Sequence, residues 1–250
     1  MKFKAIIAVM TLLLFGACKK SGDGNVRKQL LSRVRVDDVQ TLALDIDYDK
    51  EKPVEIREFS RNGTLTRYRD FAFDSKGVIV SFEKTTQSAQ PVTFKHQFNF
   101  NNNFLNNVLI TKDVSGAPVT VSSISFIGDT RDLLAQQKNG NGILVFSRKA
   151  VYDNAGNMTL LVSKKLPSGP PDTLLFSNYD NHPNVMGAFD QLRGENDFLP
   201  PSKNNPGTVV IKRSDDPPLV QQFTYEYNQQ GNPVKIITDR ISLFLEYKEL

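Results

Sequence analysis

A recurring turn signature constrains this chain more than any other feature. An aromatic residue is followed by Asp or Asn, and a Gly stands four residues after the aromatic, at 73–77, 152–156 and 227–231. Asn, Asp and Gly suit the backbone of a tight reversal, and the flanking residues alternate between apolar and polar. Each copy therefore predicts a β-hairpin.

Weaker copies extend the repeat along the chain. Tyr48-Asp49, Phe100-Asn101 and Tyr179-Asp180 keep the aromatic and the polar residue. Successive copies are separated by 25, 27, 52, 27 and 48 residues, so each of the two long gaps predicts a degenerate copy. We place one at Phe126, which is followed by Gly128-Asp129, and the other at 202–207, which has lost its aromatic.

A hairpin repeat of about 25 residues predicts the fold class. We expect an all-β protein, with a meandering antiparallel sheet that is strongly curled and one short helix and loop insertion covering a face. Helix signals are confined to Arg27–Arg33, expected as a short turn, and Asn184–Arg193, with Asn184 as the N-cap. A transmembrane barrel is the rival, but Lys and Arg fall across the predicted strands and the mean hydropathy is −0.34.

The N-terminus carries a secretory signal. Lys2 and Lys4 precede an apolar run from Ala5 to Phe15, which is too short to span a bilayer. The run ends in Phe15-Gly16-Ala17-Cys18, and Cys18 is the only cysteine in the sequence. This ending resembles the lipobox of bacterial lipoproteins, although Phe15 stands where leucine is usual.

The lipobox resemblance implies that Cys18 is acylated and becomes the mature N-terminus. Two or more acyl chains hold a protein stably on a membrane. We therefore divide the chain into a signal peptide at 1–17, a flexible tether at 18–33 and a single β-repeat domain at 34–250. Lys19 after the cysteine resembles outer-membrane sorting, so the expected location is the cell envelope, at the outer membrane.

The turn signature resembles the YD repeats of RHS-type proteins, most closely at 152–157. The lipobox, the repeat and the loops at 179–184 and 202–206 together resemble a family of Bacteroidetes lipoproteins of unknown function. The resemblance implies architecture and says nothing of an activity. RHS shells are much longer than this chain, so encapsulation is not implied.

Composition narrows the classes of function. One cysteine excludes an internal disulfide framework, and two histidines leave little for a histidine metal cage. Removal of residues 1–17 takes away two lysines and leaves a formal charge of +2, so we expect no nucleic-acid partner. We expect no metal and no cofactor.

Two features of the sequence could suggest a functional site, a run of aspartates and a histidine, but both are expected to be structural. Asp45, Asp47 and Asp49 resemble the opening of a calcium loop, yet Lys50 and Ile56 stand where glycine and glutamate are required. The same aspartates fit the solvated face of a strand whose other face is apolar. His96 alternates with phenylalanines, which predicts a histidine packed among aromatic rings on one strand face.

The segment 179–207 interrupts the hairpin rhythm and is the predicted binding region. Its candidate binding residues are His182, Asn184, Lys203, Asn204 and Asn205. Insertions into a regular scaffold often carry function because the scaffold fixes their ends. The alternative is that apolar residues here cover the sheet; those residues are Val185, Met186, Phe189, Leu192, Phe198 and Leu199.

Two functions remain open at this point. The first is a non-enzymatic, lipid-anchored envelope protein that binds or scaffolds an unidentified protein or glycan. The second is an envelope hydrolase acting on glycans, with an acid pair assembled from separate hairpins, for which Asp70, Asp74, Glu226 and Glu246 are available. No nucleophile–base motif occurs in the sequence, so we expect a protein that is not an enzyme.

Overall fold

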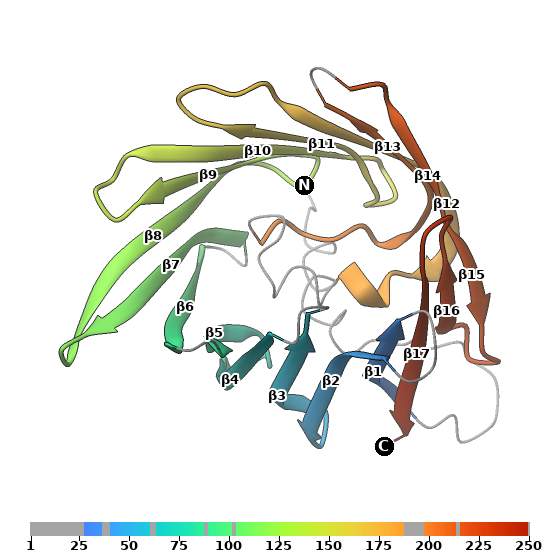
Figure 1. The fold of residues 1–250 in the computed structure, drawn as a ribbon, viewed down its shortest axis with the longest axis horizontal. Coiled ribbons are helices and arrows are strands. Elements are labelled where there is room, and N and C mark those ends of the chain that lie inside the picture. The colour runs from blue at the N-terminus through green and yellow to red at the C-terminus, as the bar shows by residue number, and fades with distance from the viewer. Residues whose placement is uncertain are drawn as a thin grey trace, which may run out of the picture. The chain divides into compact units, whose positions relative to one another are not determined.

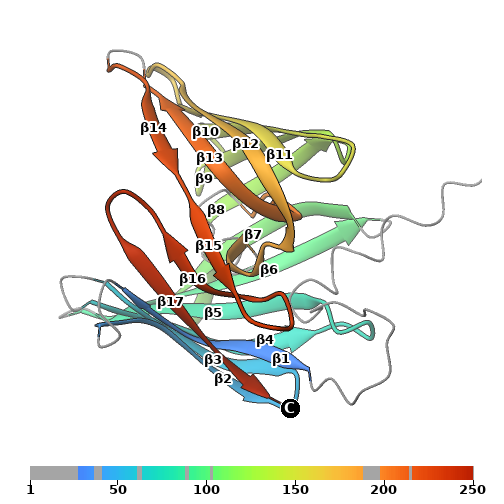
Figure 2. The same ribbon diagram turned by 90° about the vertical axis from the view of Figure 1, so that its right-hand side faces the viewer.

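A computed structural model describes residues 28–36, 41–60, 64–87, 90–101, 104–187, 198–213 and 216–249. The described residues form seventeen strands of one antiparallel sheet, with a helical segment at 185–187 (Figures 1 and 2). The predicted all-β class and the meander of sequential hairpins are confirmed. None of these residues belongs to a helix with the length and hydropathy that a membrane crossing requires.

The chain divides into two compact units. The first unit comprises residues 1–97, 112–117 and 225–250, and the second comprises 98–111 and 118–224. Strands that lie wholly in the first unit are β1 (Gln29–Val36), β2 (Thr41–Asp49), β3 (Lys52–Phe59), β4 (Leu65–Phe73), β5 (Ile79–Gln87), β16 (Pro233–Ile237) and β17 (Ser242–Glu249). Those wholly in the second are β9 (Asp132–Asn139), β10 (Leu144–Tyr152), β11 (Met158–Lys165), β12 (Asp172–Pro183), β13 (Asn204–Lys212) and β14 (Leu219–Gln222). Residues of both units occur in β6 (Val92–Asn101), β7 (Phe104–Val114), β8 (Ala117–Gly128) and β15 (Thr224–Tyr227).

In the first unit, β1 pairs with β2 along one side and with β17 along the other. The remaining pairs follow the chain, from β2 with β3 to β5 with β6. The apolar residues that alternate along β2 are buried, as predicted, with Leu44 2% and Ile46 9% exposed. Ile46 lies opposite Ile56, which lies opposite the fully buried Tyr68, so the core runs across the strands as a row.

In the second unit, the strands from β8 to β14 each pair with the next strand in the sequence. Its core follows the same alternation: Ala150 lies opposite Leu161, and both are buried. Because the side-chain period of a strand is two residues, a slip of one residue would move these side chains to the other face. Register is therefore what the turns must fix.

The N-terminal boundary differs from the prediction. Arg27–Arg33 was expected as a short turn and residues 18–33 as a tether, but β1 begins at Gln29. The reason is pairing: Val34 is buried between Leu245 of β17 and Leu44 of β2, and this row extends the strand back to Gln29 opposite Glu249. Cys18 and the rest of residues 1–27 lie outside the described residues.

The predicted turns share one hydrogen-bond pattern. Asp153 Oδ1 accepts the backbone N–H groups of Ala155 at 2.8 Å and Asn157 at 2.9 Å. The N–H of Gly156 donates to the Asp153 carbonyl at 3.1 Å, and Gly156 has φ +87°, which a side chain would strain. Asp74 forms the same bonds with Lys76, Gly77 and Val78, and Asn228 with Gln230, Gly231 and Asn232.

Another copy of this turn has no aromatic residue, and the sequence pattern missed it. Asn139 Oδ1 accepts the N–H groups of Asn141 and Ile143, each at 3.0 Å, and Gly142 has φ +77°. A shorter version occurs at the degenerate copy near Phe126, where Asp129 Oδ1 accepts from Arg131 and Asp132. The polar side chain is therefore the constant part of the turn, and the aromatic is not.

This geometry predicts the effect of removing one turn acceptor. Asp153→Ala leaves two backbone N–H groups without their side-chain acceptor, and we expect a loss of about 1–2 kcal/mol in the free energy of unfolding. Asp153→Asn is the matched control, because Asn228 performs the same role with an amide oxygen. Urea unfolding measures both variants. Equal losses for Asp153→Ala and Asp153→Asn would contradict the assignment.

Candidate functional site

The predicted binding region is one long hairpin connection. Tyr179 and Asp180 lie within β12, and Asn204 and Asn205 begin β13. Tyr179 lies opposite Pro206 across these strands, which run side by side in Figure 2. Both ends of 179–207, the segment expected to interrupt the hairpins, are therefore strand, because pairing between β12 and β13 overrides the turn-rich composition.

Asp180 and Asn205 are the two ends of a single interrupted turn. Asp180 Oδ1 accepts the N–H of His182 at 3.0 Å, just as Asp153 accepts that of Ala155. Its second donor is the N–H of Asn205 at 3.2 Å, which occupies the place that Asn157 holds in the Asp153 turn.

The strand register agrees with this equivalence. Tyr179 pairs with Pro206 as Tyr152 pairs with Met158, in each case one residue outside the turn. The sequence reading counted Tyr179-Asp180 and 202–207 as two turns. The structure joins them into one turn, in which residues 181–204, here called the insertion, stand where the Asp153 turn has only residues 154–156.

The side chains of Asn204 and Asn205 are engaged within the fold. Asn205 is 2% exposed, and its Nδ2 donates to Asp180 Oδ2 at 3.2 Å and to the carbonyls of His182 and Pro183 at 3.4 Å. The Nδ2 of Asn204 donates to the His182 carbonyl at 3.2 Å. These amides hold the two ends of the insertion together.

The other candidate binding residues lie nearby. Asn184 Oδ1 accepts the N–H of Gly187 at 2.9 Å, so the predicted N-cap is confirmed. The Asn184 N–H donates to the carbonyl of Lys203, whose side chain is exposed, and His182 is half-buried. Residues 188–197, which include Phe189, Leu192 and Gly194, lie outside the described residues. That these five residues bind a partner stays a prediction.

The returning part of the insertion packs as the covering alternative predicted. Phe198 and Leu199 are each 2% exposed, and the Phe198 ring meets the Phe98 ring edge-on at 5.2 Å. The Tyr152 hydroxyl donates to the Pro200 carbonyl at 2.7 Å. Residues 198–200 are thus held by both apolar burial and a buried hydroxyl.

Ser202 of the insertion is held by contacts with Met158 and with the Tyr179 hydroxyl. Its Oγ accepts the N–H of Met158 at 2.9 Å and lies 3.1 Å from the Tyr179 hydroxyl, which also donates to the Met158 carbonyl. Burial raises the pKa of Tyr179 to about 12 and also raises the pKa of Tyr152, so both hydroxyls keep their protons at neutral pH. The Tyr152 hydroxyl donates to Pro200 of the insertion, and the Tyr179 hydroxyl donates to Met158 of β11 and lies beside Ser202 of the insertion.

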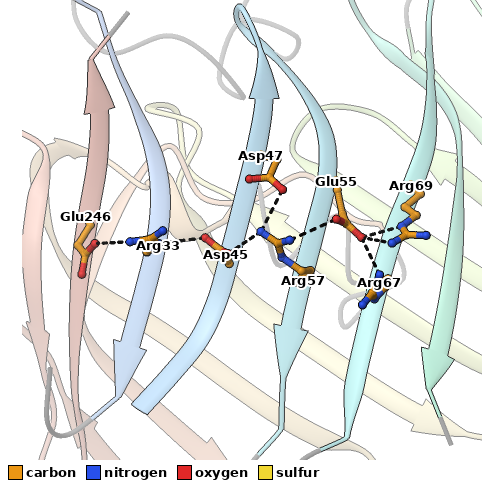
Figure 3. Close-up of polar contacts among 8 residues, drawn as sticks. All are labelled: Arg33, Asp45, Asp47, Glu55, Arg57, Arg67, Arg69 and Glu246. Carbon is orange, nitrogen blue, oxygen red and sulfur yellow. Dashed lines mark hydrogen bonds and ion pairs between the residues drawn. The ribbon is translucent and has the colours of Figure 1, made fainter. Parts of the chain in front are cut away.

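A ladder of ion pairs crosses the first unit (Figure 3). Asp45 accepts from Arg33 at 3.1 Å on one side and from Arg57 at 2.6 Å on the other. Arg33 also lies 3.8 Å from Glu246, and Glu55 contacts Arg57, Arg67 and Arg69 at 3.4, 3.5 and 2.6 Å. The strands involved are β17, β1, β2, β3 and β4. We refer to these residues, with Asp47, as the charge ladder.

The ladder gives the predicted aspartate strand face its partners. Asp45 and Asp47 both contact Arg57, and Asp47 does so at 3.0 Å. Leu44 and Ile46, which alternate with them, are buried, so the predicted alternating strand is confirmed. Within the part of the chain that the structure describes, no three His, Cys, Asp or Glu side chains are grouped to hold a metal ion. Asp49 ends β2.

His96 packs among aromatic rings, as its pattern predicts. It is 6% exposed, and its ring stacks on Phe82 with centroids 4.7 Å apart and an interplanar angle of 11°. Burial lowers the pKa of His96 to about 4, and the positive charge of Lys84 adds to this effect. The imidazole is therefore neutral in the folded protein at pH 7.

Comparison with known proteins supports the architecture. A porin-like protein from Bacteroides vulgatus ATCC 8482 is similar with a TM-score of 0.52 and 12% identity, over 88% of this chain and 99% of that one. A porin-like protein from Bacteroides uniformis ATCC 8492 has a TM-score of 0.46 and 9% identity, over 87% and 96%. At 12% identity the first likeness concerns the fold alone. No protein-family model matches the chain, and no curated protein matches it.

The buried histidine predicts a pH dependence of stability. The folded pKa of about 4 lies below the ordinary value of 6.5, so the unfolded chain takes up a proton first as pH falls. Stability from this group is complete above pH 6.5 and is lost toward pH 4, by about 3 kcal/mol. Urea unfolding of the wild type and of His96→Phe at pH 7 and pH 4 measures the difference. An unchanged pH slope in His96→Phe would contradict the prediction.

Proposed function

We propose that this protein is a lipid-anchored component of the cell envelope that acts by binding or scaffolding rather than by catalysis. The proposed anchor is an acylated Cys18, which the lipobox at 15–18 supports. The fold likeness to a porin-like protein of Bacteroides vulgatus is consistent with an outer-membrane or envelope location. The tether then begins at residue 18 and ends at β1.

The contacts of three of the four acids named for a hydrolytic pair carry the non-enzymatic part of the proposal. Asp74, one of the acids available for a hydrolytic pair, accepts two backbone N–H groups in its turn. Glu226 lies 3.3 Å from Lys235, and Glu246 lies 2.7 Å from Arg35. The buried His96 is stacked on a ring, so it supports the core rather than a reaction.

The alternative, a glycan hydrolase, has one observation in its favour. Asp47 and Glu55 lie opposite each other on β2 and β3, as a pair of facing carboxylates would. However, Arg57 nitrogens lie 3.0 and 3.4 Å from their oxygens, in the space that a glycosidic bond and a water would need. The geometry therefore favours the binding function.

The charge ladder also favours a β domain held at the membrane surface over one whose strands span the membrane. A transmembrane strand presents an apolar face to lipid. On β2 the apolar side chains Leu44 and Ile46 are buried, and the opposite face carries Asp45 and Asp47. The anchor would then hold the protein at the membrane without a strand that spans it.

The anchor is tested directly by Cys18→Ala. We expect the variant to leave membranes washed in high salt for the soluble fraction or to remain as an uncleaved precursor, because no thiol is left to acylate. Ser21→Ala is the matched control and should stay in the membrane fraction. Mass spectrometry of the wild-type mature protein should show an acylated N-terminal Cys18. An unmodified Cys18 thiol would refute the anchor, and turnover of glycan substrates would refute the non-enzymatic part.

A further inference from the structure

Basic side chains gather at one end of the strands of the second unit. Because β9 to β14 pair in sequence order and run antiparallel, the connections β9–β10, β11–β12 and β13–β14 all lie at this end of the strands (Figure 1). The registers place the strand ends together: Lys138 lies opposite Leu144, Lys165 opposite Phe146 and Lys212 opposite Thr173. We call this the basic edge; its cations are Lys138, Lys164, Lys165, Lys212 and Arg213.

The cations of the basic edge face solvent. All five side chains belong to exposed residues, and none forms an ion pair with a carboxylate in the described parts of the chain. The described acids at this edge are Asp172, the first residue of β12, and Asp216. The edge therefore carries a net positive charge, unlike the charge ladder, in which each arginine meets a carboxylate.

Exposed aliphatic side chains accompany the cations. Ile143 in the β9–β10 turn is 60% exposed, and Leu219 and Val220 at the start of β14 are 38% and 50% exposed. Val119 of β8 is 46% exposed. It lies at the same end of the strands, because Ser122, three residues later in β8, pairs with Asn139 at the start of the β9–β10 turn. Such exposed aliphatic side chains contribute favourably to the free energy only when a partner removes them from water.

We propose that the basic edge docks on a membrane surface rich in anionic lipid. Lysine and arginine are attracted to anionic headgroups, and aliphatic side chains between them enter the boundary with the acyl chains. An anionic polymer in water would pair with the cations but would leave Ile143 and Val220 exposed, so the mixture of both residue types favours lipid. The inference goes beyond the proposed anchor: the anchor holds the protein, and the basic edge orients it.

Vesicle binding by an unlipidated chain tests the basic edge apart from the anchor. The chain from residue 18 onward, carrying Cys18→Ser, retains every described strand. We expect it to sediment with vesicles of phosphatidylcholine and 30% phosphatidylglycerol, and more weakly with phosphatidylcholine alone or in high salt. The triple variant Lys138→Glu, Lys165→Glu and Lys212→Glu should bind the anionic vesicles at least 100-fold more weakly, at about fivefold per cation.

Matched variants separate the possible outcomes. Lys50→Glu, Lys76→Glu and Lys248→Glu together change the charge equally on exposed lysines of the first unit, and they should retain binding. Ile143→Ser should weaken vesicle binding severalfold without changing its salt dependence. Three results would overturn the proposal: no preference for anionic vesicles, equal losses in both triple variants, or binding to soluble dextran sulfate as tight as to vesicles with Ile143→Ser unaffected. Because no acyl chain is present, each is independent of the Cys18 result.

Discussion

A single side-chain oxygen that accepts two backbone N–H groups is the interaction on which this fold depends. At Asp153 it closes the turn between β10 and β11, and Asp74, Asn139 and Asn228 repeat it elsewhere. A fixed turn fixes the register of the two strands that leave it, and the register decides which face of each strand is buried. In a sheet made of sequential hairpins, the local turns therefore determine the core.

The interrupted turn shows how the same interaction accommodates an insertion. The oxygen of Asp180 still holds two donors, but Asn205 supplies the second one from across the insertion. The strands beside it keep the ordinary register, so the scaffold is unaltered while residues 181–204 are added. Phe198 and Leu199 then pack as core side chains, which anchors the returning end of the insertion.

The sequence was informative wherever the structure depends on neighbours along the chain. The alternation of Leu44 and Ile46 with Asp45 and Asp47 predicted the strand and its faces, and Asp153 and Gly156 predicted a turn. Asn139 escapes the repeat signature because no aromatic residue precedes it, and the turn chemistry does not need one.

The sequence pattern does not predict contacts between residues far apart in the chain, because these depend on which strands pair. Glu246 lies near Arg33 only because β17 returns beside β1, and Arg57 meets Asp45 only because of the β2–β3 register. In the same way, Asn205 donates to Asp180 only because β13 returns beside β12, whereas the sequence pattern assigns the two residues to separate turns.

The equivalence of the interrupted turn with the ordinary turns is the central claim, and a double-mutant cycle tests it most directly. Asp180→Ala, Asn205→Ala and the double variant are unfolded in urea, and the interaction energy is taken from the four free energies. The Asn205 side-chain amide donates to Asp180 Oδ2 as that of Asn157 donates to Asp153 Oδ2, so if Asp180 and Asn205 form one turn of this kind, their effects should be coupled by about 1–2 kcal/mol. Additive effects, within about 0.5 kcal/mol, would show that the two residues act separately and would contradict the account.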